Sequence, residues 1–163
     1  HATTFRSPKS LHVDYDEATA AWLLDRAAVR DAGGKLLATV VRDGSDVIGW
    51  YICHLDREGN GEVAQIEATP AAVPRVLDHL FYEAWKHGAV AVTGRLEPRY
   101  MQALSDKYCV FHRRGPWMLV KTSNAELQRA FEAGTTNFAR LDGEWSLRYL
   151  APVTAPQIAA AAS

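Results

Sequence analysis

The sequence is poor in the residues that mark several large classes of protein. It has only two cysteines, Cys53 and Cys109, which form no CxxC motif and are too few for a disulfide framework. Both have apolar neighbours, so we expect them to be buried thiols of a cytoplasmic protein. The six histidines show no HxxEH-type spacing, and we therefore expect no metal site.

Long apolar runs and a strong net charge are missing as well. No apolar run approaches the roughly 20 residues that span a bilayer, and the first residues, His1–Arg6, do not resemble a signal peptide. The formal net charge of −1 gives no general attraction to nucleic acid or to a membrane surface, and we expect neither as a partner. The chain does have 48% hydrophobic residues in a length of 163, enough for one domain with a substantial core.

The first half of the chain predicts one helix and then a group of strands. Residues 1–15 are interpreted as an N-terminal arm, and apolar residues from Asp16 onward recur at helical spacing until Gly33-Gly34. Two turn signals, Asp43-Gly44 and Asp56–Gly61, separate three strand-like segments: Lys35–Arg42, Val47–Leu55 and Glu62–Ala68. Three strands joined by two tight turns predict an antiparallel meander.

The middle of the chain carries an amphipathic helix between two strands. Gly88 is its expected C-terminal cap, and its apolar stripe consists of Val73, Val76, Leu77, Leu80, Phe81, Ala84 and Trp85. Ala89–Leu96 is almost entirely apolar, as expected of a strand buried on both faces. We therefore predict a right-handed crossover, with Glu62–Ala68 and Ala89–Leu96 as parallel neighbours that splay apart near Thr69.

The last third of the chain is predicted to close the domain. Pro98 suits the first turn of a further helix, whose inner side we assign to Met101, Leu104 and Tyr108. The remaining predicted elements are, in chain order, the strands Cys109–Arg113 and Trp117–Thr122, a capped helix Ser123–Ala133 and the strand Glu144–Tyr149. Residues 16–150 are predicted to form one domain, followed by a loose tail at 151–163.

This order of elements resembles the GNAT acetyltransferase superfamily. VVRDGSDVIGWYICHL is similar to its second hairpin, and LDHLFYEAWKHGAVAVTGRLEP is similar to its core helix and the strand after it. LSDKYCVFHRRGPWMLV is similar to its later helix and closing strands, and LDGEWSL to the ending of some GNAT-like proteins. The resemblance covers about residues 16–122 and continues toward 150. It implies an α+β fold with a mixed, mostly antiparallel sheet flanked by helices.

The resemblance also implies a site for acetyl-CoA or another acyl-CoA. Members of the superfamily hold the CoA pyrophosphate at the start of the core helix, through a motif of the type Gln/Arg-x-x-Gly-x-Gly/Ala. The matching segment, Ala71–Val76, has no glycine, and Pro74 lacks an amide donor, so we expect weak binding. The implied cofactor-binding residues are Ile66, Ala68, Val73, Pro74 and Arg75. Arg75 adds a charge to this site, or else it is an ordinary solvated helix residue.

Two catalytic residues are implied by the same resemblance. The superfamily often places a carboxylate base on the strand before the core helix and a tyrosine acid late in the next helix. Glu67 and Tyr108 are the candidates, although the family pattern YxxxGF puts Asp106 at the position of the tyrosine. The alternatives are an exposed strand carboxylate for Glu67 and core packing for Tyr108. A separate cationic group, His112-Arg113-Arg114 before Trp117, is either an anion-binding patch or a charged surface hairpin.

Two functions therefore stay open. The first is an acyltransferase that moves an acyl group from acyl-CoA to an unidentified amine, with Glu67 as base and Tyr108 as acid. The second is a non-catalytic GNAT-like binding module, for example the C-terminal half of a tandem protein that packs against a companion GNAT domain.

Overall fold

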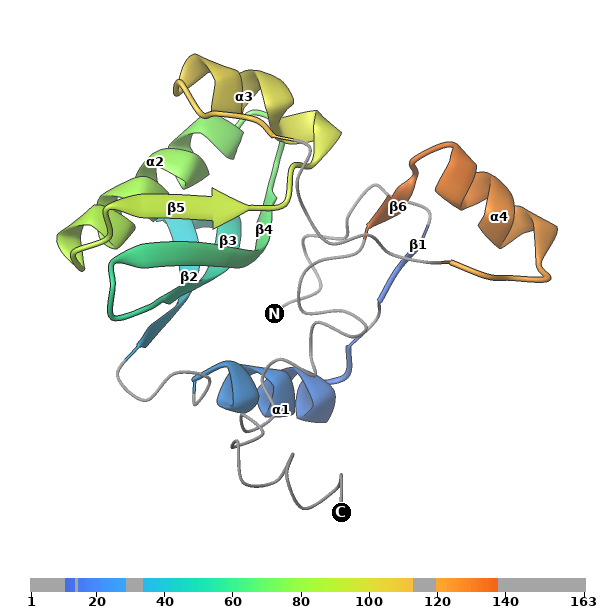
Figure 1. The fold of residues 1–163 in the computed structure, drawn as a ribbon, viewed down its shortest axis with the longest axis horizontal. Helices are drawn as coiled ribbons and strands as arrows, with labels where there is room; N and C mark the ends of the chain where they lie inside the picture. The colour runs from blue at the N-terminus through green and yellow to red at the C-terminus, as the bar shows by residue number, and fades with distance from the viewer. Residues whose placement is uncertain (1–10, 14, 29–33, 113–119, 138–163) are drawn as a thin grey trace, which may run out of the picture.

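The computed structural model describes residues 11–13, 15–28, 34–112 and 120–137 (Figure 1). Its main sheet has four strands in the order β2-β3-β4-β5, namely β2 Lys35–Asp43, β3 Asp46–Leu55, β4 Asn60–Ala68 and β5 Ala91–Gly94. β2 pairs with β3 and β3 with β4 in antiparallel fashion, whereas β4 and β5 are parallel. The fold is α+β with a mixed, mostly antiparallel sheet, as predicted.

The described residues form four α-helices and one 3-10 turn. They are α1 Glu17–Ala28, α2 Val73–Lys86, the 3-10 turn η2 Pro98–Tyr100, α3 Met101–Asp106 and α4 Ala125–Glu132. Figure 1 shows α2 lying along the sheet, with α3 next to α2. On the other face, Leu24 of α1 packs against Ile52 and Ala64. A small parallel sheet joins β1 Leu11–His12 to β6 Thr136–Asn137, apart from the main sheet (Figure 1).

The core lies between α2 and the sheet. Val76, Leu80 and Ala84 are fully buried and pack in one cluster with Tyr51 and Cys53 of β3. Residues three and four positions apart share one face of a helix, so this stripe buries the apolar side of α2. Burial of each large aliphatic side chain contributes about 1.5–3 kcal/mol to folding. The C-terminal end of α2 follows the prediction, because Gly88 has a φ of 86° and Ala89 N donates to Ala84 O at 2.9 Å.

The parallel pair β4 and β5 is short, and its strands part toward the end of β4. The pairing runs from Asn60 opposite Ala91 to Val63 opposite Gly94, while β4 itself continues to Ala68. The predicted parallel neighbours and the splay near Thr69 are thus confirmed. The strand Ala89–Leu96 was predicted too long, because within the described residues only Ala91–Gly94 finds a partner, and its predicted burial on both faces is wrong, because most of β5 is exposed.

Two aromatic residues assigned to the core are instead exposed. Trp85 is 69% exposed. At 3.6 residues per turn it lies about 120° from Val73, at the margin of the buried stripe. Tyr108 is 94% exposed and has a φ of 58°. The helix α3 ends before it in a Schellman motif, since Cys109 N donates to Leu104 O at 3.1 Å. Tyr108 is the residue with the left-handed backbone conformation in this motif, so its side chain does not continue the inner face of α3.

The predicted closing strands are only partly testable. Cys109–His112 and Val120–Thr122 form no strand, so these parts of the predicted strands are wrong. The rest of them, residues 113 and 117–119, lies outside the described residues, as do the predicted strand Glu144–Tyr149 and the tail at 151–163. The predicted arm, residues 1–15, includes β1, which was not predicted. The helix predicted at Ser123–Ala133 is α4, capped by Asn124 Oδ1, which accepts from Glu126 N at 2.8 Å.

Candidate functional site

A cavity of about 120 Å³ opens where β4 and β5 part. Its walls are Val63 and Ile66 of β4, Leu77, Leu80 and Phe81 of α2, residues 92–96, Tyr100, Leu104 and residues 109–111. Most of these side chains are aliphatic or aromatic. A cavity of about 150 Å³ with such a lining admits a ligand the size of benzene. The cavity therefore has the size and chemistry for a short apolar segment of a ligand.

Glu67 lies next to this region and is held by an arginine. The side chain is buried, with the residue only 5% exposed, so the alternative of an exposed strand carboxylate is wrong. Arg99 Nη2 in the turn η2 donates to both of its carboxylate oxygens, at 2.9 Å to Oε1 and 2.8 Å to Oε2. Charge-assisted hydrogen bonds of this kind are stronger than those between neutral groups. A buried carboxylate is thus available at the end of β4, but with its oxygens engaged.

Tyr100 is a site residue that the sequence analysis missed. It is 3% exposed, lines the cavity, and its Oη donates to Ile66 O at 3.4 Å. Burial raises the pKa of Tyr100 to about 12, so at neutral pH the side chain is an uncharged phenol. The Arg99 guanidinium lies over the Tyr100 ring, with Cζ 4.6 Å from the ring centroid. The signal in the sequence was the proline-initiated turn Pro98-Arg99-Tyr100 shortly after a predicted strand.

The N-terminus of α2 offers few amide donors for an anion. Ala72 N and Val73 N both donate to Thr69 O, at 2.8 and 3.1 Å, and Pro74 has no N–H. Within the part of the chain that the structure describes, Arg75 N is the one amide of the first helical turn without an acceptor. A phosphate site at a helix N-terminus normally uses several such amides.

The five implied cofactor-binding residues do not form one surface. Ile66 lines the cavity, whereas Ala68 and Val73 are buried in the core cluster. Pro74 is exposed at the start of α2, and the Arg75 guanidinium donates to Asp43 Oδ2 at 2.8 Å, which lowers the pKa of Asp43. The predicted pocket bordered by residues 66–68 and 73–75 thus shares Ile66 alone with the cavity between β4 and β5.

Other candidate residues lie away from the cavity walls. Tyr108 does not line the cavity, although the adjacent residues 109–111 do. His112 is exposed, and the cationic residues after it, with Trp117, lie outside the described residues. Among the residues that the structure describes, no three His, Cys, Asp or Glu side chains gather closely enough to hold a metal ion. No described helix combines the length and apolar character needed to cross a membrane.

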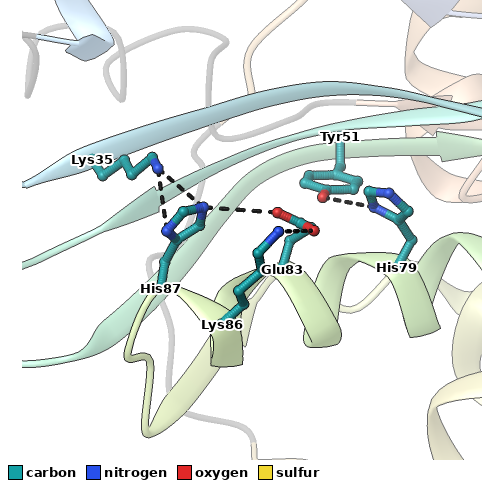
Figure 2. Close-up of polar contacts among 6 residues, drawn as sticks. All are labelled: Lys35, Tyr51, His79, Glu83, Lys86 and His87. Carbon is teal, nitrogen blue, oxygen red and sulfur yellow. Dashed lines mark hydrogen bonds and ion pairs between the residues drawn. The ribbon is translucent and has the colours of Figure 1, made fainter.

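A second group of polar side chains lies between α2 and the strands β2 and β3 (Figure 2). His79 Nδ1 is 3.0 Å from the buried Tyr51 Oη, and Glu83 Oε2 is 3.7 Å from His87 Nε2. Lys35 Nζ at the start of β2 is 3.0 Å from His87 Nε2. His79, Glu83 and His87 are four residues apart, so they share one face of α2. This row fastens α2 to the sheet, away from the cavity walls.

Comparisons with known proteins leave the family of this chain unassigned. Neither protein-family models nor curated proteins gave a match. Among solved structures, the crystal structure of wild-type TTHA1254 from Thermus thermophilus is similar, with 19% sequence identity and a TM-score of 0.39. The match covers 61% of this chain and 78% of that one. The fold class of this chain is therefore assigned from its own strand pairing.

Proposed function

We propose that this domain is a divergent GNAT-like acyltransferase, which moves an acetyl or other acyl group from acyl-CoA to an amine. The observation that carries the proposal is the apolar cavity between the parting strands β4 and β5. Ligands of sheets with parallel strands usually lie where neighbouring strands separate, beyond their carboxyl ends. The acyl group and the sulfur-bearing end of pantetheine are the apolar parts of acyl-CoA, and they suit this lining.

The chemistry requires a base beside the cavity. The amine nitrogen attacks the thioester carbonyl carbon, the C–S bond breaks, the nitrogen loses a proton and the departing thiolate gains one. Glu67 is the proposed base, because it stands at the end of β4 and is held by Arg99, whose guanidinium lies over the ring of the cavity residue Tyr100. To accept a proton, one carboxylate oxygen of Glu67 must first give up the hydrogen bond that it accepts from Arg99. Tyr108 stays the proposed acid from the family resemblance, but its exposure gives this role no support.

The proposed cofactor is bound weakly. One unsatisfied amide at the start of α2 replaces the several donors of a phosphate-binding turn. Arg75 can add a charge only by leaving Asp43, with which it forms an exposed ion pair. We therefore expect most of the binding free energy to come from the acyl and pantetheine parts in the cavity rather than from the pyrophosphate.

A second function, a non-catalytic binding module, is favoured by one observation. Arg99 engages both oxygens of Glu67, which is the arrangement of a structural ion pair. In this alternative the domain packs against a companion domain, and no acyl group is transferred.

Thiol release separates the two functions. The purified chain is incubated with acetyl-CoA and a panel of amines, and the free CoA thiol is measured. The panel contains an amino sugar, a polyamine, lysine and a dipeptide with a free α-amino group. The enzyme predicts amine-dependent release that saturates with acetyl-CoA. The binding module predicts release no faster than in buffer with every amine, and that result across chemically different amines would count against catalysis.

A further inference from the structure

Among the strands that the structure describes, none covers one edge of β4 at its C-terminal end. Thr69 N donates to Ile48 O of β3 at 3.3 Å, and Trp50 of β3 lies opposite Glu67. Because backbone groups point alternately to the two edges of a strand, those of Ile66 and Ala68 point away from β3. The pairing with β5 stops at Val63, so β5 does not reach these groups.

The turn η2 occupies this edge in place of a strand. Tyr100 Oη donates to Ile66 O at 3.4 Å, and the same oxygen is in hydrogen-bond contact with the Ala68 N–H. The Tyr100 hydroxyl thus pairs with one backbone acceptor, Ile66 O, and one backbone donor, the Ala68 N–H. In a parallel sheet, a single residue of the neighbouring strand would pair with these two groups through its own N–H and C=O. Arg99 fastens the residue between them, because its Nη2 holds the carboxylate of Glu67. Two adjacent residues of η2 therefore hold three consecutive residues of β4.

The hydrogen bonds of this contact are less than optimal. The Tyr100 bond to Ile66 is long for an O–H donor, and Arg99 uses Nη2 alone for both oxygens instead of its two-nitrogen fork. Arg99 Nε is buried without a hydrogen-bond partner among the residues that the structure describes. A contact with long and unmade bonds is more easily replaced by a competing ligand than a fully satisfied one.

We propose that Arg99 and Tyr100 form a latch that closes the β4 edge, and that an extended, amide-bearing ligand must displace the Tyr100 hydroxyl to bind there. This inference rests on the proposed function, in which that ligand is the pantetheine arm of acyl-CoA. An N–H and a C=O of such an arm can pair with Ile66 O and Ala68 N–H, as an added strand does. Moving η2 also withdraws Arg99 from Glu67. Binding of the acyl donor is thereby coupled to freeing the base, and the closed latch lowers the apparent affinity.

The test uses Tyr100→Phe, which removes the hydroxyl and keeps the ring in its buried position. Acetyl-CoA affinity is measured by calorimetry, and exchange of the Ala68 amide by NMR without ligand. The latch predicts faster Ala68 exchange in the variant and about three- to tenfold tighter binding of acetyl-CoA, since one competing hydrogen bond is lost. Tyr82→Phe, on the exposed side of α2, is the matched control and should change neither quantity.

The outcomes separate the latch from the proposed function. Weaker binding or unchanged Ala68 exchange in Tyr100→Phe overturns the latch. Faster Ala68 exchange with no acetyl-CoA binding by either protein supports the closed edge and overturns acyl-CoA as its ligand. If Tyr100→Phe does not fold, Arg99→Lys tests the same contact. Lysine keeps the charge opposite Glu67 but loosens the turn, so we expect a gain in acetyl-CoA affinity smaller than that of Tyr100→Phe. A loss of acetyl-CoA affinity in Arg99→Lys overturns the latch.

Discussion

Tyr108 has the backbone conformation that glycine most readily adopts at the end of a helix. Its φ of 58° costs an L-residue with a Cβ about 1–2 kcal/mol, and the exposed side chain recovers little of this. We expect Tyr108→Gly to raise the free energy of unfolding by about 0.5–1 kcal/mol, measured by urea denaturation. Lys107→Gly is the control: its φ is −98°, so glycine should destabilise there. A less stable Tyr108→Gly variant would mean that the tyrosine side chain makes a stabilising contact.

Glu67 is the residue on which the proposed chemistry depends. Glu67→Gln keeps the size of the side chain and removes its ability to accept a proton at neutral pH. We expect turnover with the best amine to fall at least about 100-fold, while acetyl-CoA affinity changes less than about threefold. Glu62→Gln, on the same strand but at the end paired with β5, should leave turnover unchanged. Unaltered turnover in Glu67→Gln would remove this residue from the mechanism.

The phenol of Tyr100 makes folding stability sensitive to alkaline pH. Burial raises its pKa from 10.0 to about 12, so between these values the unfolded chain releases a proton that the folded protein keeps. The contribution of Tyr100 to the free energy of unfolding is therefore fully present below pH 10. It falls by about 2 kcal/mol as the pH rises toward 12. Burial likewise raises the pKa of the Cys53 thiol from 9.0 to about 12, so this group also makes the folded protein less stable at alkaline pH. Tyr100→Phe should reduce the loss of stability above pH 10, and an identical pH profile would show that Tyr100 is not the cause.

At the scale of secondary-structure elements, the close approach of α2 to the sheet fixes the end of β4. Gly49 of β3 lies opposite Ala68, and a Cβ there would be 2.6 Å from Glu67 O and 2.6 Å from Val76 Cγ2. Both distances are far below van der Waals contact, and the first atom belongs to the backbone. Gly49→Ala must therefore push β4 or α2 away.

We expect Gly49→Ala to lower the free energy of unfolding by about 1–3 kcal/mol. It should also change the NMR shifts of Ile66 and Ala68, since the displaced strand carries the site. Val40→Ala on the neighbouring strand β2 is exposed, and should cost less than about 0.5 kcal/mol. A Gly49→Ala variant as stable as the wild type would show that the packing of α2 on β3 is looser than the structure has it.

Sequence patterns predicted the elements that depend on local signals. The meander follows from its two turn signals, and α2 follows from its apolar stripe and Gly88. Cys109–His112 has the composition of a strand, yet residues 109–111 line the cavity instead of pairing. The contacts of Arg99 and Tyr100 with β4 join residues more than 30 positions apart, and local patterns carry no information on such pairs. The sequence therefore located the end of β4 correctly but missed the turn that covers it.

At the scale of the whole molecule, the proposed function depends on whether the cavity between β4 and β5 receives acyl-CoA. Calorimetry with acetyl-CoA tests this most directly, on the wild type and on two variants of the short helix α3. Leu104 lines the cavity, so Leu104→Trp fills it, whereas Met101 is exposed and Met101→Trp does not.

We expect saturable binding of acetyl-CoA by the wild type, with a Kd no tighter than about 100 μM, or roughly −5.5 kcal/mol. Leu104→Trp should weaken this binding at least about tenfold, and Met101→Trp should leave it unchanged, provided that both variants melt as cooperatively as the wild type. No saturable heat from the wild type, or equal affinity in Leu104→Trp, would contradict the claim that the cavity is the acyl-CoA site.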